Sequence, residues 1–330
     1  MPSGKKALVT GCNRFIGSHL VEALVRRGYE VHCFVRRTSN LHWLEPVARD
    51  FCYGELREKD SLKSAVKDID YVFHLAAVTK ACFPETFYQV NWWGTKNLLE
   101  ACREANPKLK KFVYLSSQAS AGPSLNGRPV KEEDCPHPVS HYGKSKLKAE
   151  TEVLKFTLDF PVLILRPPGV YGPRDDDFYI YFKLVKRGVS PILGGGENLV
   201  NLIFVKDLIE GIILAAEKDL LSGEIFFLAD ERVYTWREIT QTIVSTMGKK
   251  VCEIKIPKSL AVIAGSMGDR FSHLTKKPFI INRDKIKEML QPAWICDISK
   301  AKNKLGFQAK YSLTEGIKTT AKWYKENKWL

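Results

Sequence analysis

Residues 6–17 are Lys6-Ala7-Leu8-Val9-Thr10-Gly11-Cys12-Asn13-Arg14-Phe15-Ile16-Gly17, and this stretch decides the fold. The short apolar run before Thr10 predicts a buried strand, and the apolar spacing from Phe15 to Arg27 predicts a helix. The first turn of such a helix offers free N–H groups and the positive end of the helix dipole to a pyrophosphate. The stretch therefore predicts a dinucleotide-binding turn.

A turn of this kind normally contains three glycines. They allow a tight bend, a close approach of the backbone to phosphate, and close packing of the helix on the strand. Gly11 and Gly17 fill two of these roles, but Arg14 stands where the middle glycine is expected. The turn is therefore altered at one position.

The composition is that of a globular protein. With 330 residues, of which 45% are hydrophobic, the chain is long enough for one large domain or two unequal ones. About five residues separate Met1 from the first strand, which leaves no room for a signal peptide, and no uninterrupted apolar run is long enough to span a bilayer. We therefore expect a cytoplasmic protein without stable membrane insertion.

The cysteines and charges indicate which partners to expect. The eight cysteines are scattered without a close pair, which predicts neither a disulfide framework nor a metal site. The formal net charge of +14 favours anionic partners such as phosphorylated cofactors. Because Lys and Arg are spread along the chain rather than gathered in one basic block, we expect no nucleic-acid partner.

Short apolar segments alternate with helical segments along the first half of the chain. Strands are predicted at residues 30–35, 50–53, 70–75, 111–116 and 161–166, and helices at 61–66, 86–105 and 142–158. This alternation predicts right-handed crossovers and an α/β fold with a doubly wound parallel sheet of the Rossmann type. Ligands then bind at the carboxyl ends of the strands, where the turn after the first strand lies.

Beyond Arg166 the alternation weakens. Turn signals follow at Pro167-Pro168-Gly169 and Tyr171-Gly172-Pro173. We predict a dinucleotide-binding domain over residues 1–167 and a smaller, discontinuous substrate domain over 168–201 and 231–330. Residues 202–230 are expected to return to the main sheet, because 202–216 and 224–228 are regular and apolar.

Tyr142 and Lys146 lie four residues apart and so share one face of the predicted helix. A free tyrosine has a pKa of about 10 and is a poor base at neutral pH until a nearby positive charge, here Lys146, stabilises the phenolate. Such a tyrosine exchanges a proton with a carbonyl or alcohol oxygen while a nicotinamide exchanges hydride with the carbon. A Tyr–Lys pair at this spacing is also common on helix surfaces.

Two serines follow the strand that precedes this helix. Ser116 and Ser117 lie at the edge of the sheet where ligands bind, and a hydroxyl there can hold the substrate oxygen. Serines at strand ends also commonly satisfy backbone groups, so both interpretations stay open at this point.

Together these features resemble the extended short-chain dehydrogenase/reductase family, which includes the NAD-dependent epimerases and dehydratases. The resemblance covers nearly the whole chain. It depends on Thr10-Gly11 to Gly17, Gly54-Glu55-Leu56, His74-Leu75-Ala76-Ala77, Asn91 with Gly94-Thr95, Ser116-Ser117, Tyr142 to Lys146, Arg166-Pro167 with Val170-Tyr171-Gly172-Pro173, and Asp297 with Leu305-Gly306-Phe307. These pieces, in the family's order, imply an enzyme.

The resemblance implies a catalytic triad of Ser117, Tyr142 and Lys146. Ser117 is preferred over Ser116 because it lies five residues before Gly122, as the family's catalytic serine or threonine does before its own glycine. In the family, the third-strand turn contacts the adenine and the fourth-strand turn lines the cofactor, although the alanines there are equally suited to close packing alone. The implied cofactor-binding set is Gly11, Asn13, Arg14, Phe15, Ile16, Gly17, Arg36, Arg37, Glu55, Leu56, Leu75, Ala76, Ala77, Tyr142, Lys146, Pro167 and Val170.

The choice of cofactor depends on the end of the second strand, where enzymes that prefer NAD usually have an acidic residue. Here that place is Val35-Arg36-Arg37, and two guanidinium groups can pair with the 2′-phosphate of NADP. Dihydroflavonol-reductase-like members of the family look similar at this point. NADP is therefore the predicted cofactor, with NAD as the alternative.

Arg14 leaves two interpretations open. Its guanidinium is a third cation for the 2′-phosphate, or its side chain obstructs phosphate and weakens binding. Asn-Arg at this place looks like NADP-using members of the classical branch, whose compensating glycine follows one residue later. Phe15 occupies that later position, so the loop matches neither branch fully.

The substrate class is predicted from groups that are missing. Members that bind nucleotide sugars tend to hold the diphosphate with an asparagine and an arginine, where this chain has Gly169 and Val200. The stretch from Ser116 to Pro123 is instead similar to 3β-hydroxysteroid-dehydrogenase-like members. We predict an NAD(P)-dependent oxidoreductase that interconverts a ketone and a secondary alcohol on a bulky, apolar small molecule. The apolar segment 260–271 is expected to be a lid over it or a core helix.

Two other functions stay open. One is a nucleotide-sugar 4-epimerase of the same family, and the other is a non-catalytic, nucleotide-sensing relative, which Arg14 favours and the complete catalytic set opposes. Family members commonly dimerise by packing the helix after Thr86 and the helix with Tyr142 into a four-helix bundle. A homodimer is therefore expected.

Overall fold

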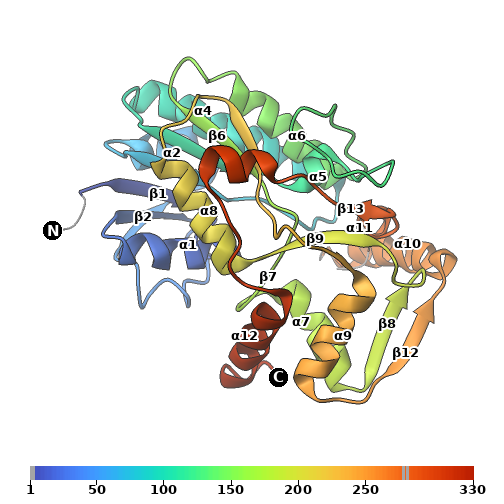
Figure 1. The fold of residues 1–330 in the computed structure, drawn as a ribbon. Coiled ribbons are helices and arrows are strands. Elements are labelled where there is room, and N and C mark those ends of the chain that lie inside the picture. Colours follow the sequence, from blue (N-terminus) through green and yellow to red (C-terminus); the bar gives the residue numbers. More distant parts are fainter. Residues whose placement is uncertain (1–3, 277–278, 280–281) are drawn as a thin grey trace.

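The computed structural model describes residues 4–276, 279 and 282–330 (Figure 1). Its centre is a parallel sheet of seven strands in the order β10-β6-β5-β4-β1-β2-β3. The strands are β1 (Lys6–Thr10), β2 (Glu30–Val35), β3 (Asp50–Tyr53), β4 (Tyr71–His74), β5 (Lys111–Leu115), β6 (Val162–Arg166) and β10 (Glu224–Phe227). The direction of winding reverses between β1 and β4, which is where such sheets bind ligands. The predicted Rossmann-type α/β fold is confirmed.

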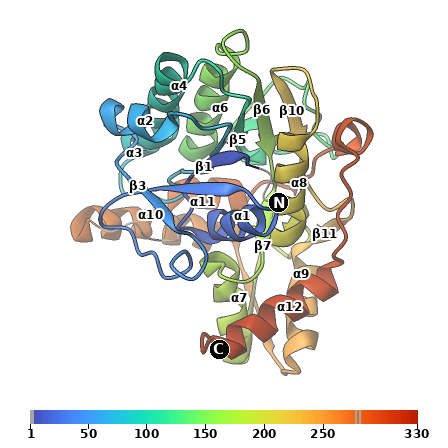
Figure 2. The same cartoon turned by 90° about the vertical axis from the view of Figure 1, so that its left-hand side faces the viewer.

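Helices cover both faces of this sheet. Along β1, Ala7 and Val9 enter one hydrophobic cluster and Leu8 enters the other, because successive side chains of a strand point to opposite faces. The first face is covered by α1 (Phe15–Arg26) and α8 (Val205–Glu217), and the second by α2 (Lys59–Val66), α4 (Gly94–Ala105) and α6 (His141–Leu154), the upper helices of Figure 2. Burial on both faces explains why these strands are apolar throughout.

Two helices differ from the ranges predicted for them. The helix predicted over 86–105 begins at Pro84, where a proline is well tolerated, and consists of α3 (Pro84–Phe87), the π-helical turn η1 (Tyr88–Trp93) and α4. The helix predicted over 142–158 is α6 and ends at Leu154. It ends early because Phe156 and Phe160 turn inward and join the hydrophobic cluster around Phe112.

The remaining elements form two small sheets with their own helices. One sheet contains β7 (Gly169–Tyr171), β9 (Leu199–Phe204), β11 (Val233–Thr235) and β13 (Ala293–Trp294), and the other pairs β8 (Val189–Leu193) with β12 (Cys252–Ile256). The helices are α5 (Gln118–Ala121), α7 (Asp176–Lys186), α9 (Trp236–Met247), α10 (Lys258–Thr275), α11 (Arg283–Met289), the π-helical turn η2 (Ala301–Leu305) and α12 (Leu313–Glu326). None of the helices in the described ranges is long and apolar enough to cross a membrane.

Residues 202–230 return to the main sheet only in part. Strand β10 pairs in parallel with β6, and α8 packs against the main sheet beside α1. Residues 202–204, however, belong to β9, which pairs with β7, β11 and β13 and not with the main sheet. The expectation for these three residues is wrong because β7 starts at Gly169, directly after β6, and provides a closer partner for β9.

Candidate active site

Apart from Tyr142 and Lys146, which lie in α6, the predicted site residues lie in or next to six loops along one edge of the main sheet. Each loop follows the carboxyl end of a strand, and the strands are neighbours, so the loops are neighbours too. The loops contain Gly11 to Gly17 after β1, Arg36 and Arg37 after β2, Glu55 and Leu56 after β3, Leu75 to Ala77 after β4, Ser117 after β5, and Pro167 after β6 with Val170 in β7. The fold therefore gathers residues from six separate parts of the chain.

The turn after β1 has no room for side chains at its two glycines. Gly11 has a φ of +69°, and a Cβ there would lie 2.7 Å from the backbone nitrogen of Ala76. A Cβ on Gly17 would lie 2.2 Å from the carbonyl oxygen of Gly11. The first glycine thus permits the bend and the contact with the β4 loop, and the second permits the helix to pack on the turn.

The N-terminus of α1 is open to an anion. Arg14 is its N-cap residue and forms no side-chain cap, so the first-turn N–H groups keep their hydrogen-bonding capacity. The side chain of Arg14 is exposed and makes no hydrogen bond or ion pair with any residue that the structure describes. Its backbone N–H closes the turn on the carbonyl of Gly11 at 3.2 Å. An arginine at this position therefore leaves the backbone cradle intact, and the cradle fits a pyrophosphate.

Two further arginines lie next to this turn. Arg36 and Arg37 follow β2, which pairs directly with β1, and both are exposed. The guanidinium of Arg37 lies 5.7 Å from the ring centroid of Tyr53, at the end of β3. In the third loop, Glu55 is paired with Arg57 at 3.3 Å. Within the described residues neither Arg36 nor Arg37 forms an ion pair, so the exposed surface beside the turn is positively charged.

The side chains of Ser117 and Tyr142 lie close enough to interact, since Ser117 lowers the pKa of the Tyr142 phenol. Ser117 is the N-cap of the short helix α5, and Tyr142 lies in the first turn of α6, which is capped by Ser140. Burial raises the pKa of Tyr142 to about 12, and the contact with Ser117 opposes this rise. The phenol is therefore neutral at pH 7 and can donate its proton.

Lys146 is buried one helical turn further along α6. Its Nζ donates a hydrogen bond of 2.6 Å to the carbonyl oxygen of Leu115 and lies 4.2 Å from the ring centroid of Tyr114. Burial lowers the pKa of Lys146 to about 7, partly offset by Glu150. In this structure the ammonium is directed to the end of β5, so its predicted effect on the pKa of Tyr142 stays a prediction.

Behind the serine loop lies a buried ion pair that sequence reasoning missed. Arg166 donates two hydrogen bonds to Glu150, at 3.0 and 2.6 Å, and both side chains are 2% exposed. Glu150 also accepts hydrogen bonds from Ser116 and Ser120. The single hydroxyl proton of Ser120 is shared between Glu150 and the carbonyl oxygen of Ser117 (2.7 Å), so the ion pair lies against the loop that positions the Ser117 hydroxyl. The one available signal was the spacing of Glu150, four residues after Lys146.

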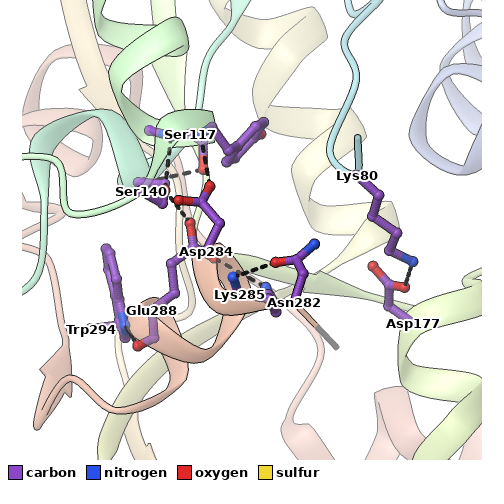
Figure 3. Close-up of polar contacts among 12 residues, drawn as sticks. Lys80, Ser117, Ser140, Asp177, Asn282, Asp284, Lys285, Glu288 and Trp294 are labelled. Carbon is purple, nitrogen blue, oxygen red and sulfur yellow. Dashed lines mark hydrogen bonds and ion pairs between the residues drawn. The ribbon is translucent and has the colours of Figure 1, made fainter. Parts of the chain in front are cut away.

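A second missed contact comes from α11, far along the chain. The carboxylate of Asp284 accepts the backbone N–H groups of His141 (2.8 Å) and Tyr142 (3.3 Å), and Glu288 accepts the hydroxyl of Ser140 at 2.6 Å. Figure 3 shows both carboxylates directed from α11 toward Ser140 and Ser117. They complete the hydrogen bonding at the N-terminus of α6, and no signal in the sequence near Asp284 pointed to this role.

Asn91, quoted for the family resemblance, ties the fourth loop to the catalytic helix. Its side-chain amide bonds both backbone groups of Val78, at 2.7 and 3.0 Å, and donates to the hydroxyl of Ser145 at 2.9 Å. The site therefore combines a helix N-terminus that is open to an anion, a neutral phenol beside a serine, and a lysine whose pKa is lowered to about 7. This arrangement is suited to transfer a proton beside a bound nicotinamide.

The family model described as NAD dependent epimerase/dehydratase family matches residues 7–229. The chain belongs to this family. Its predicted place among the extended short-chain dehydrogenases/reductases, and the prediction of a nicotinamide-dependent enzyme, are thereby confirmed.

Individual members of the family are similar over most of the chain. A ceramide reductase from Caulobacter vibrioides is 30% identical over 98% of this chain and 95% of its own. The human sterol-4-alpha-carboxylate 3-dehydrogenase (decarboxylating) is 32% identical over 72% of this chain and 66% of its own. A UDP-glucuronic acid 4-epimerase from Bacillus cereus, solved in complex with NAD, has a TM-score of 0.79 at 26% identity and covers 98% of this chain and 99% of its own.

Proposed function

We propose that this protein is an NADP-linked oxidoreductase that reduces a ketone, or oxidises the corresponding secondary alcohol, on a bulky apolar substrate. The proposal depends on one observation: the side chains of Ser117 and Tyr142 lie beside each other, at the sheet edge that also holds the glycine turn.

The reaction needs a proton at the substrate oxygen. When bound, the nicotinamide supplies hydride to the carbonyl carbon or accepts it from the alcohol carbon. Ser117 holds the substrate oxygen by a hydrogen bond, and Tyr142 transfers the phenolic proton to that oxygen. A neutral phenol at pH 7 suits reduction. Lys146 holds the charge of the phenolate once its ammonium leaves the carbonyl of Leu115.

NADP is favoured over NAD by charge. Arg14, Arg36 and Arg37 lie beside the turn that fits the pyrophosphate, and their exposed guanidinium groups can pair with a 2′-phosphate. The UDP-glucuronic acid 4-epimerase was solved with NAD, so binding measurements on this chain must decide between NAD and NADP.

An apolar substrate is favoured by the surroundings of the site. Val200 is buried in β9 and Gly169 has no side chain, so neither can hold a diphosphate. The similarity to a ceramide reductase and to a sterol dehydrogenase is consistent with a lipid-like ketone.

The catalytic assignment is tested with Tyr142→Phe. NADPH oxidation is followed with detergent-dispersed long-chain ketones and 3-oxosteroids, and we expect kcat to fall by about 10²–10⁴-fold while NADPH binding by calorimetry is unchanged. Tyr88→Phe is the matched control, because the Tyr88 hydroxyl contacts His141 (3.1 Å) and not Ser117. Equal turnover by the two variants would show the mechanism to be wrong.

The cofactor assignment is tested with the double variant Arg36→Ala/Arg37→Ala. We expect the Kd for NADPH to rise about tenfold or more, with little change for NADH, because only NADPH has the 2′-phosphate. Arg57→Ala is the control, since Arg57 is already paired with Glu55. If the unaltered protein bound neither cofactor, the non-catalytic alternative would replace this proposal.

A nucleotide-sugar 4-epimerase is the second candidate function. It is favoured by the structural likeness to the NAD-bound UDP-glucuronic acid 4-epimerase over nearly the whole chain. Calorimetric titration with UDP-glucose and UDP-glucuronic acid distinguishes the two functions. Tight binding of either sugar nucleotide would favour the epimerase, and its absence favours the ketone reductase.

A further inference from the structure

Helix α10 buries one row of small residues and leaves its large apolar side chains exposed. Ala261, Gly265, Gly268 and Ser272 are buried, at the spacing that places them on one face of a helix. This face packs against α11, and a Cβ on Gly265 would lie 3.0 Å from the side chain of Ile286. The small residues therefore allow the two helices to approach closely.

The large apolar side chains of α10 lie on a different face. They follow one another at intervals of three or four residues, and each is between 53% and 83% exposed. They are Leu260, Ile263, Met267, Phe271 and Leu274, and together we call them the apolar stripe. At 1.5 Å per residue the stripe is about 20 Å long. An ordinary surface helix turns its large apolar residues to the core. Because the stripe is exposed, the expectation of a core helix here is wrong. An exposed apolar stripe of this size indicates a binding surface.

The unpaired charges on α10 and near its two ends are positive. Lys255, Lys258, Arg270 and Lys276 are exposed and form no ion pair within the described part of the chain. The neighbouring acidic side chains are already engaged, Glu253 with Arg237 at 3.1 Å and Asp269 with Arg283 at 3.6 Å. The whole chain has a net charge of +14. An anionic partner is therefore favoured, and a second copy of the chain is opposed by repulsion between like charges.

We propose that α10 docks this protein onto an anionic lipid bilayer, with the apolar stripe inserted at the boundary between headgroups and acyl chains and the surrounding cations on the headgroups. A helix with one apolar and one polar face lies in the plane of such an interface and does not span it. In Figure 1, α10 lies at the right-hand margin of the molecule, on the side opposite β1 and β2 of the main sheet.

The position of α10 relates the docking to the proposed function. α10 packs on α11, and α11 contacts the first turn of the helix that contains Tyr142 through Asp284. A docked protein would thus hold its reactive phenol two helices from the lipid, where an apolar ketone is concentrated. This last step depends on the proposed function, whereas the docking itself does not.

The experiment measures co-sedimentation of the full chain with phosphatidylcholine vesicles, with and without phosphatidylserine. We expect binding to the vesicles that contain phosphatidylserine, weakened by salt. Ile263→Ser/Met267→Ser should lower the partition coefficient by about tenfold to a hundredfold, because two exposed apolar side chains lose their insertion. Leu158→Ser/Leu221→Ser is the control, since these leucines are even more exposed than Ile263 and Met267 but lie elsewhere. Lys258→Glu/Arg270→Glu should remove the preference for phosphatidylserine.

Three results would overturn the proposal. The first is that the unaltered chain does not bind vesicles. The second is that the stripe variant and its control bind vesicles equally. The third is that the unaltered chain forms an oligomer in lipid-free solution and that only the stripe variant fails to form it. The last would assign the stripe to a second copy of the chain. Tyr142→Phe separates the two proposals, because it should bind vesicles normally. Loss of the docking leaves the Tyr142 result unchanged, and failure of the Tyr142 prediction leaves vesicle binding unchanged.

Discussion

Replacing Arg166 by methionine should destabilise the protein strongly. Arg166 and Glu150 are both 2% exposed, and the guanidinium provides two of the hydrogen bonds to that carboxylate. In Arg166→Met, the carboxylate keeps only the hydroxyls of Ser116 and Ser120. The substitution therefore leaves Glu150 as a buried charge without its counter-ion, which lowers the free energy of unfolding.

The size of the expected loss of stability follows from the burial of the Arg166–Glu150 ion pair. Removing one partner of a fully buried ion pair costs about 3–5 kcal/mol. One guanidinium nitrogen of Arg166 has no hydrogen-bond partner among the described residues, so the intact pair is imperfect and the lower half of this range is expected. For a chain of 330 residues the entropy of unfolding is about 0.7 kcal/mol per degree, so Tm should fall by about 4–6 °C.

The assay is thermal unfolding followed by circular dichroism, with Arg128→Met as control. Arg128 pairs with Asp134 on the surface, where its side chain is 60% exposed, so this variant should lose less than about 1 kcal/mol. Adding Glu150→Gln to Arg166→Met should restore part of the Tm, because the amide oxygen still accepts from the serines without a buried charge. An unchanged Tm in Arg166→Met, or a double variant less stable than the single one, would refute the reasoning.

Three other predictions concern the site. Because burial lowers the pKa of Lys146 from 10.5 to about 7, the unfolded chain binds its proton more tightly, so the free energy of unfolding should rise between pH 7 and pH 10.5. Lys146→Met should remove this slope in unfolding titrations and stabilise the protein at pH 7 by up to about 4 kcal/mol. Gly17→Ala places a Cβ 2.2 Å from the carbonyl of Gly11 and should cost about 1–3 kcal/mol and abolish cofactor binding in calorimetry. Asp284→Ala removes the acceptor for two N–H groups of α6 and should lower stability by about 1–2 kcal/mol and kcat more than it changes KM, with recovery in Asp284→Asn.

Much of the fold was predictable because it depends on local pattern. Fully buried parallel strands need continuous apolar runs, and the helices between them need apolar side chains at helical spacing, so both leave a signal within a few residues. The bounds of the helices and the pairing of the strands were less predictable. The inward turn at Phe156 and the early start at Pro84 depend on partners elsewhere in the chain. The pairing of β9 with β7 likewise depends on where β6 ends.

The candidate site was likewise predictable only in part. The glycine turn, Ser117 and Tyr142 could be found because the chemistry they suit needs those residue types at fixed spacing. The direction of the Lys146 ammonium could not, because spacing along a helix places a side chain on a face without deciding which acceptor it contacts. The face that α10 buries was also hidden, since both its small and its large residues recur at helical spacing.

The sequence by itself determined the strand, turn and helix at residues 6–17, the alternation that builds the Rossmann-type sheet, and the candidate Ser117, Tyr142 and Lys146. These follow from backbone geometry and hydrophobic period, which act over short distances. Only the tertiary structure decided that Glu150 pairs with Arg166, that Asp284 caps the helix of Tyr142, and that the apolar stripe faces outward. These depend on burial and on contacts across up to 143 residues of chain, for which no local pattern is required.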